Sequence, residues 1–415
     1  MRNFKKLCFL MFFTTTIFYG QQEKIDLVPI YEKTFKDTIV DLIFEEVEVT
    51  VKEAKSLGVK GLEDKSDEEK ISFPEVKVII TEKEVKFLDK KGKVKKKINI
   101  GYKDVFKVNK SKNEKFIGIK VLENNDKTKA KFMMFNKDGK KLWEINEYLY
   151  NFVVSPDGKY VIEIPSIEYG HQAPLRMLGS KGLIKEIPKP HISIGIDFSE
   201  NGEYVVIGLN NRKKKEGYLL LIDRYGEELW RHTVGTAVGA ISISPTGKFI
   251  SGIGSQDTLN ILFVFDKIGN LIFTYSQLPK IGNIEMKFDE NSNLLLLTST
   301  EFCGYLFDLS KSKLIWKYEP ELKTNYFRGA IFSGNFNTII FLSPGYHGKS
   351  YYLYIVNKEG KEILVKELGI KKFITHFCYS AGMFKPYVIL SKDGNYIYGG
   401  KIDGVEVYRI KGEVK

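Results

Sequence analysis

Cysteine and histidine are scarce in this chain of 415 residues, which contains three cysteines and five histidines. Cys8 lies in an N-terminal apolar run, so only Cys303 and Cys378 remain in the rest of the chain, too few for a disulfide framework. No two histidines are separated by one helical turn, the spacing of many zinc-ligand pairs. We therefore expect no metal site and no cofactor, and we expect most histidines to have ordinary structural roles.

Long apolar runs are absent except at the N-terminus. Arg2, Lys5 and Lys6 precede an apolar run from Leu7 to Tyr19, after which the chain turns polar. This pattern is typical of a secretory signal peptide, which we place at residues 1–22. The run is short for a membrane-spanning helix, and an uncleaved anchor is the alternative. No cysteine for lipid attachment follows it, so we expect a mature chain without a transmembrane segment, either periplasmic or secreted.

Charge is divided unevenly along the chain. The net charge is +12, and residues 1–22 contribute three positive side chains and no acid. Residues 23–75 contain 15 acidic and 8 basic side chains, so this leader carries −7 and residues 76–415 carry +16. The charged run EDKSDEEK near its end favours an extended arm with a solvated linker. The alternative is that the acidic leader covers the basic body and weakens its binding to anionic partners.

What the chain does contain is a repeat. A short turn motif begins at Ser155 (SPDGKYV), and variants begin at Ser199 (SENGEYV), Ser244 (SPTGKFI) and Ser391 (SKDGNYI). Asn109, Asp289 and Ser333 are taken as the equivalent positions of three further repeats. The successive intervals are then 46, 44, 45, 45, 44 and 58 residues. Apolar or alternating runs flank each motif, which is the pattern of two strands joined by a tight turn.

A second hairpin follows each of these first hairpins. It consists of an apolar strand, then Asp or Asn, then in most repeats a glycine three residues later, as in LLLIDRYGEELW at Asp223. Glycine permits the positive φ that such turns need, and Asp or Asn can accept hydrogen bonds from nearby backbone. Trp143, Trp230 and Trp316 all fall at the end of a second hairpin. We expect all three to be buried at equivalent contacts between repeats.

Four strands in a repeat of about 45 residues are typical of a β-propeller. A single four-stranded sheet cannot bury both of its faces until neighbours stack on it in a ring. The sequence therefore predicts an all-β propeller over residues 76–411 with seven four-stranded blades, and an eighth, irregular blade is the alternative. We expect the blade at the seam to be built from both termini. Cys303 and Cys378 lie about two blades apart, so we expect no bridge between them.

These motifs resemble those of two groups of β-propellers. SPDGKYV and SKDGNYIYGGKIDGVEVYRI look like WD40-like repeats, whereas DLSKSKLIW and DRYGEELW look like the docking motif of quinoprotein-type (PQQ-repeat) propellers. The likeness covers turn and packing positions, so it implies a fold rather than a reaction. Its nearest functional analogy is with outer-membrane assembly propellers of the quinoprotein-like group. The adjacent cysteines expected of a PQQ dehydrogenase are absent.

One predicted face of the ring carries tight turns, and the other, which we call the open face, carries the longer and more varied connections. Binding and catalytic residues concentrate on such connections. The candidate binding residues of the open face are Tyr169, His171, His191, Arg212, Lys213, Tyr326, Arg328, Tyr346, His347 and His376. Cys378 follows His376 by two residues, but no element resembling an oxyanion hole accompanies this pair.

Two functions stay open on these observations. The favoured one is a non-enzymatic binding or scaffold module for a protein or an anionic polymer of the cell envelope, because a basic ring occurs without a catalytic constellation. The alternative is a propeller-based enzyme, sulfate-transferring or sugar-processing, with His191 or His376 and Arg328 around the central channel. We expect no nucleic acid as a partner, because secretion separates the protein from it.

Overall fold

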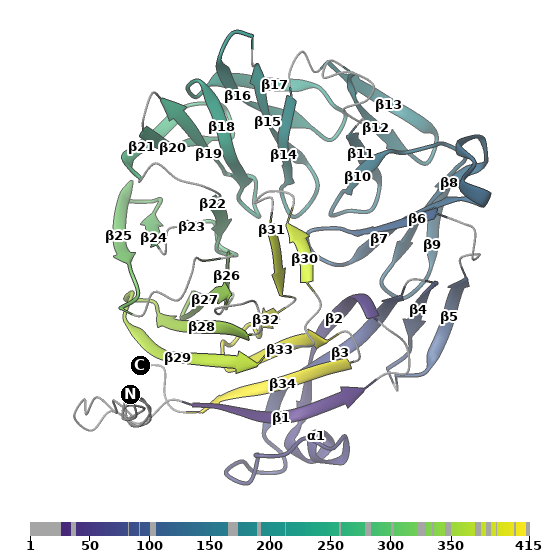
Figure 1. The fold of residues 1–415 in the computed structure, drawn as a ribbon, viewed down its shortest axis with the longest axis vertical. Coiled ribbons are helices and arrows are strands. Elements are labelled where there is room, and N and C mark those ends of the chain that lie inside the picture. Colours follow the sequence, from purple (N-terminus) through teal and green to yellow (C-terminus); the bar gives the residue numbers. More distant parts are fainter. Residues whose placement is uncertain are drawn as a thin grey trace, which may run out of the picture.

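The fold is a ring of β-sheets around a central axis (Figure 1). The computed structural model describes residues 26–34, 39–81, 83–90, 92–99, 105–164, 173–188, 192–211, 213–256, 259–278, 284–299, 303–321, 327, 329–333, 336–344, 350–369, 375–378, 383–386, 388–401 and 404–411. Within these ranges the chain forms eight four-stranded antiparallel sheets and one separate two-stranded hairpin. The structure confirms the all-β propeller, and its number of blades is eight.

Six blades are built in simple chain order, each from four consecutive strands with the first one innermost. These are blade C (β6 Val105–Lys110, β7 Phe116–Leu122, β8 Ala130–Asn136, β9 Lys141–Ile145), blade D (β10 Asn151–Val154, β11 Tyr160–Ile164, β12 Leu175–Gly179, β13 Gly182–Ile187), blade E (β14 Ile192–Phe198, β15 Tyr204–Asn211, β16 Glu216–Asp223, β17 Glu228–Thr233), blade F (β18 Ala237–Ile243, β19 Phe249–Gln256, β20 Leu259–Asp266, β21 Leu271–Leu278), blade G (β22 Ile284–Phe288, β23 Leu294–Ser299, β24 Cys303–Asp308, β25 Lys313–Tyr318) and blade H (β26 Gly329–Phe332, β27 Thr338–Pro344, β28 Ser350–Asn357, β29 Glu362–Gly369). Two short 3-10 helices, η1 Glu123–Asn125 and η2 Lys127–Lys129, lie between β7 and β8.

The remaining two blades use the N-terminal part of the chain. Blade B consists of β2 Ile39–Thr50, β3 Lys70–Thr81, β4 Glu84–Leu88 and β5 Val94–Asn99, with helix α1 Val51–Ser56 between β2 and β3. Blade A consists of β32 Val388–Leu390, β33 Tyr396–Lys401, β34 Gly404–Lys411 and, outermost, β1 Asp26–Thr34. The pairing of β1 with β34 runs from Asp26 opposite Lys411 to Thr34 opposite Gly404. The seam is thus built from both termini, as the sequence predicted, but its N-terminal strand comes from the acidic leader and not from the predicted propeller region of residues 76–411.

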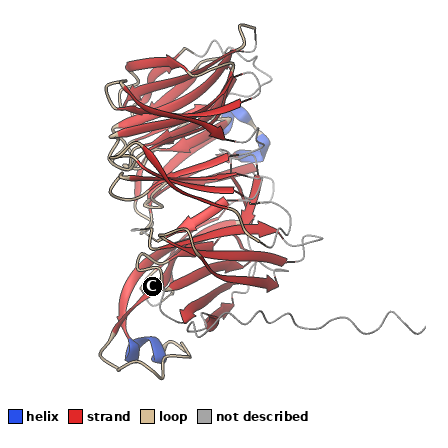
Figure 2. Cartoon of the chain, turned by 90° about the vertical axis from the view of Figure 1, so that its left-hand side faces the viewer, coloured by secondary structure: helices blue, strands red, loops and turns tan. Residues whose placement is uncertain are grey.

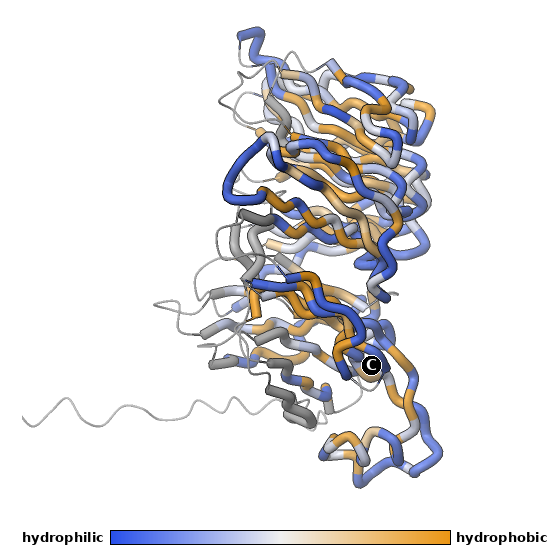
Figure 3. The backbone as a smooth tube through the Cα atoms, turned by 90° about the vertical axis from the view of Figure 1, so that its right-hand side faces the viewer, coloured by the Kyte–Doolittle hydropathy of each residue, from blue (hydrophilic) through white to orange (hydrophobic). Residues whose placement is uncertain are grey.

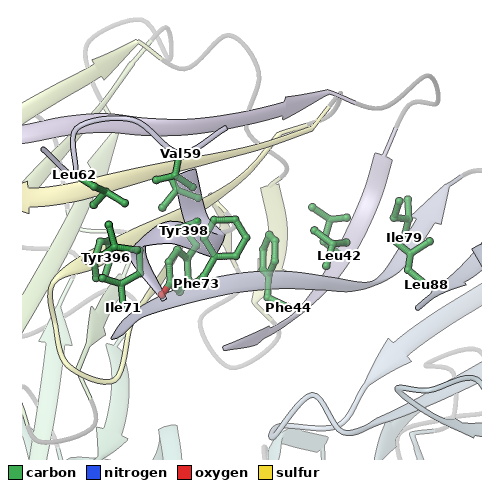
Figure 4. Packing of buried hydrophobic residues seen from close by; sticks show 14 of the residues in the cluster. Leu42, Phe44, Val59, Leu62, Ile71, Phe73, Ile79, Leu88, Tyr396 and Tyr398 are labelled. Carbon is green, nitrogen blue, oxygen red and sulfur yellow. The ribbon is translucent and has the colours of Figure 1, made fainter. Parts of the chain in front are cut away.

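The acidic segment that we expected to form an arm is part of the ring. It supplies β1, β2 and α1, because IVDLIFEEVEVT contains enough apolar side chains for a buried innermost strand: Leu42 and Ile43 are fully buried. Leu42 and Phe44 belong to one cluster with Val59 and Leu62 of the connection and Tyr398 of blade A (Figure 4). This segment provides the additional strands that complete an eighth blade.

The acidic side chains of this segment pair with basic side chains of the blades. Asp41 lies 3.1 Å from Lys110 in blade C, and Glu45 contacts both Lys77 and Lys137. Asp64, in the connection after α1, forms a bidentate pair with the guanidinium of Arg409 in blade A, at 2.8 and 3.0 Å. The acidic segment therefore neutralises basic side chains of blades A, B and C as an integral part of the ring. It does not lie on the ring as a separate cover.

The hydrophobic core is divided among the contacts between neighbouring blades. The described residues form eight buried clusters, one at each interface around the ring, from the A–B cluster to the H–A cluster. Strand segments are rich in apolar residues, whereas the turns at the edges of the ring are hydrophilic (Figure 3). Each blade is therefore stable only between two neighbours, which is why the ring must close. No helix among the described residues is long and apolar enough to cross a membrane.

The serine turns share one hydrogen-bonding pattern. In the turn at Ser155, the Gly158 N–H donates to the Ser155 carbonyl and the Tyr160 N–H donates to the Ser155 hydroxyl. Gly158 has a φ of 68°, which glycine adopts without strain. In blade C the same pattern begins at Ser111 rather than at Asn109, which lies within β6, and Glu114 takes the positive φ of 55°. Because this turn has no glycine to mark it, the start predicted from the sequence, Asn109, lies two residues before the actual start at Ser111.

The three tryptophans dock onto the next blade, but they are only partly buried. The indole N–H of Trp230 donates to the Lys267 carbonyl of blade F, and that of Trp316 donates to the Lys358 carbonyl of blade H, at 3.2 and 2.9 Å. Trp143 donates to the Gly158 carbonyl of blade D at 2.7 Å. The expected docking role is correct, and the expected burial is only partial, because the outermost strand of each blade faces solvent on its outer side.

Candidate functional site

Only two of the ten candidate binding residues fall within the described part of the chain. Lys213 is exposed in the turn after β15, where the N–H groups of Lys213 and Lys214 both donate to Asn211 Oδ1 at 3.1 Å. His376 belongs to β30 Thr375–Cys378, which pairs with β31 Met383–Pro386, and it lies opposite Lys385. The other eight lie outside the described residues: Tyr169, His171, His191, Arg212, Tyr326, Arg328, Tyr346 and His347. A joint site of these ten residues therefore stays a prediction.

The hairpin of β30 and β31 accounts for the long interval before Ser391. Viewed down the axis, it lies inside the circle of the innermost strands (Figure 1). It is the only described sheet that is not one of the eight blades. The sequence could not place this hairpin, because no periodic pattern relates it to the other repeats.

A lysine from blade C ties three blades together near the axis. Lys112 Nζ lies 2.8 and 2.9 Å from the two carboxylate oxygens of Asp197, at the end of β14 in blade E. The same carboxylate accepts hydrogen bonds from the Ser242 hydroxyl and the Ile243 N–H of blade F, at 3.1 and 3.0 Å. Because blade D stands between blades C and E, this contact links the turn after β6 to β14, which belongs to a blade that is not a direct neighbour of blade C.

The excess of positive charge is concentrated in the outer strands of blade B, β4 and β5, and in blade C. In the rest of blade B, the acidic residues of β2 and of the connection after it offset the positive charge. Residues 83–141, which run from β4 to the start of β9, contain 20 basic and 7 acidic side chains and therefore carry +13. That is most of the +16 assigned to residues 76–415. We call residues 83–141 the basic sector. A count of charge in short windows along the sequence would have found it, whereas the division into leader and body was too coarse to reveal it.

Many lysines of the basic sector are available to a partner. Nine of them are exposed and form no ion pair within 4.0 Å with an acidic residue in the described part of the chain: Lys83, Lys90, Lys93, Lys95, Lys115, Lys127, Lys129, Lys131 and Lys140. Lys95 and Lys131 lie on strands, Lys127 and Lys129 lie in η2, and the others lie in turns. Seen from the side, such turns form both edges of the ring (Figure 2). The sector is thus a broad positive surface rather than a pocket for one small ligand.

One lysine of the sector is buried instead. Lys120 Nζ donates to the Tyr150 carbonyl at 3.1 Å and lies 5.1 Å from the centre of the Tyr148 ring. Lys127 Nζ lies 5.0 Å from the same ring. Burial and then the charge of Lys107 lower the pKa of Lys120, and Glu163 acts in the opposite direction. The environment of Lys120 therefore disfavours the protonated, positively charged form of its side chain.

An ion-pair network stands beside this lysine in blade D. Arg176 Nε donates to Glu163 at 2.6 Å, and its Nη1 donates to Glu147 at 3.1 Å. Glu163 also accepts the Tyr150 N–H at 2.7 Å. Burial opposes the charge of Arg176, but these two carboxylates raise its pKa. The network fixes the chain after β9, so its role is structural.

The described residues contain no arrangement with evident catalytic chemistry. Cys303 is buried and its thiol donates a hydrogen bond to Glu319 Oε1 at 3.6 Å; burial and then the Glu319 charge raise its pKa, so it is a poor nucleophile. No group of three or more His, Cys, Asp or Glu side chains that could hold a metal ion occurs among the described residues. His191 and Arg328, on which the enzyme alternative rests, lie outside the described residues, so that alternative stays a prediction.

The fold defines the class, an eight-bladed β-propeller, and in this chain the outer strands of blade B together with blade C carry the basic sector. No sequence family and no curated protein matches this chain. Among solved structures it is similar to the crystal structure of BamB from Moraxella catarrhalis, with 14% sequence identity and a TM-score of 0.51. The similarity covers 80% of this chain and 94% of that one. At this identity the likeness concerns the fold alone.

Proposed function

We propose that this propeller is a non-enzymatic scaffold outside the cytoplasm that binds an anionic polymer or an acidic protein surface of the cell envelope through its basic sector. The observation that carries the proposal is the group of nine exposed lysines of the basic sector that form no ion pair within the described residues. The signal-peptide pattern of residues 1–22 supports the location. The propeller likeness supports a binding role by analogy only.

The chemistry of the sector favours a large anionic partner. Lysine is a flexible point charge without the fixed geometry that arginine offers to a single carboxylate or phosphate. Exposed charges are screened over about 8 to 10 Å at physiological salt, so binding requires many direct contacts and weakens as salt rises. Clustered positive charge also accelerates the encounter with an acidic partner.

The test compares two triple charge reversals in the full mature chain on heparin resin in a salt gradient. The variant Lys90→Glu, Lys93→Glu, Lys95→Glu changes the sector, and Lys213→Glu, Lys214→Glu, Lys215→Glu is its control with the same change of charge. We expect the first variant to elute at much lower salt than the wild type and the second, which includes the candidate residue Lys213, to shift clearly less. Circular dichroism confirms that both are folded.

Two outcomes would count against the proposal. Equal shifts of both variants would mean that only net charge matters and that the sector has no special role. Unchanged elution of both would mean that the exposed lysines serve solubility.

A further inference from the structure

Among the described residues, the outermost strand of each blade pairs along one edge only, and seven of the eight outermost strands carry charged residues. Their sequences are DLVPIYEKT (β1), VKKKIN (β5), KLWEI (β9), GLIKEI (β13), ELWRHT (β17), KLIWKY (β25) and EILVKELG (β29). Charges on an edge strand, lysine above all, and proline prevent other strands from adding to it. Strand β21 in blade F, LIFTYSQL, contains neither charge nor proline. It is the exception in this ring.

The exposed positions of β21 are uncharged, and exposed apolar residues lie at both ends of the hairpin that it forms with β20. Leu271 at its start is 53% exposed, Ile268 in the preceding turn is 71% exposed, and Leu259 at the start of β20 is 51% exposed. Thr274 and Ser276 are exposed further along the strand. A neutral strand with exposed apolar neighbours and unpaired backbone groups can bind a further strand by main-chain hydrogen bonds and side-chain contacts together.

Strand β21 is fixed in place by side chains that pack against blade G. The Tyr275 ring meets the Phe307 ring of blade G edge-on with their centres 5.2 Å apart, and the Phe273 ring lies 6.0 Å from the same ring. Ile272, Phe273 and Tyr275 all pack against the buried cluster between blades F and G. A partner strand would therefore meet an edge that is already in place, which lowers the entropic cost of binding.

We propose that the free edge of β21 binds an extended segment of another protein, which adds to blade F as a fifth strand. The chemistry of the edge selects a segment that is extended, free of proline and uncharged at its centre. This surface is separate from the basic sector, since blade F stands opposite blade B in the ring (Figure 1). A scaffold with both surfaces could hold two partners at once.

The shape of β21 favours a flexible segment over a second copy of this chain. Its register with β20 shifts twice, between Asn260 and Leu262 and between Val264 and Phe265. Such bulges bend a strand and increase its twist, which opposes the pairing of two preformed sheet edges. A segment that is extended but not yet folded can follow the bend.

The test uses the full mature chain and a labelled, end-blocked peptide of eight alternating valine and threonine residues. We expect saturable binding by fluorescence anisotropy, unchanged between low and high salt, and slower hydrogen exchange at the amides of β21 than at those of β17. The double variant Thr274→Lys, Ser276→Lys, at exposed positions, should bind about tenfold more weakly. The matched control Thr233→Lys, at an exposed position on β17, should bind as the wild type does.

Three results would overturn this inference. The first is no protection of β21, or equal protection of all outermost strands. The second is retained binding of a peptide with proline at alternate positions. The third is protection of β21 that rises with protein concentration without peptide, which would make a second copy the occupant. None of them bears on the heparin experiment, so the two proposals fail separately.

Discussion

Blades B and F have the same four-stranded plan, yet their outermost strands differ completely in chemistry. β5 in blade B reads VKKKIN, and β21 in blade F reads LIFTYSQL. Both pair with the third strand of their blade through a register that includes a shift. The propeller fold therefore does not depend on the charge of its outermost strands. These positions are free to differ between blades and are where we place the two binding surfaces.

Residues on the inner strands cannot vary in this way, because other chain segments pack closely against them. We predict the largest loss of stability for a substitution there. A Cβ atom at Gly254 in β19 would stand 1.5 Å from the Val234 carbonyl oxygen, where the connection from blade E passes. The obstacle is backbone, which cannot move aside cheaply. We expect Gly254→Ala to lower the free energy of unfolding by about 3 kcal/mol or more.

Urea denaturation measures this effect, and Thr274→Ala on the outer strand of the same blade is the control. The control should change the free energy of unfolding by less than about 0.5 kcal/mol. Similar losses for both variants would contradict the contrast between inner and outer positions.

A smaller effect is expected at the lysine that ties blades C, E and F. Lys112→Met removes the pair with Asp197, whose carboxylate keeps its hydrogen bonds to Ser242 and Ile243. Because both side chains are partly exposed, we expect a loss of about 0.5 to 1 kcal/mol in the free energy of unfolding. Lys115→Met, an exposed residue of the same turn without a described ion pair, should have no measurable effect. If Lys112→Met and Lys115→Met have the same free energy of unfolding, the ion pair between Lys112 and Asp197 makes no measurable contribution to stability.

The smallest effect concerns the buried lysine of the basic sector. Burial lowers the pKa of Lys120 in the folded state, so the unfolded chain binds more protons at this residue. The free energy of unfolding should therefore rise with pH from the folded pKa up to about 10.4, the ordinary lysine value, and Lys120→Met should lack this rise. Thermal denaturation of both proteins from pH 8 upward measures the difference. A difference that stays constant or falls with pH would show that Lys120 is solvated when charged.

Features held by short-range interactions were predictable from the sequence, and features held by long-range interactions were not. The turn at Ser155 was predictable because its hydrogen bonds join residues no more than five positions apart. The docking of Trp230 and Trp316 was predictable from their equal repeat positions. The position of the first turn was missed by two residues, since Glu114 occupies a conformation that glycine holds in other repeats. The candidate site rested on long connections without periodicity, and only Lys213 and His376 of its ten residues fall in the described chain.

The sequence by itself determined the repeat, the four strands of each unit and thus the ring, because turn chemistry and strand alternation act between near neighbours in the chain. Only the tertiary structure decided that the acidic N-terminal segment forms strands of blades A and B, since Asp26 finds its pairing partner at Lys411. It likewise decided which charges are neutralised, as Asp41 and Asp64 are by Lys110 and Arg409, and which edge stays free of charge. These properties depend on contacts between distant residues, and no local pattern encodes them.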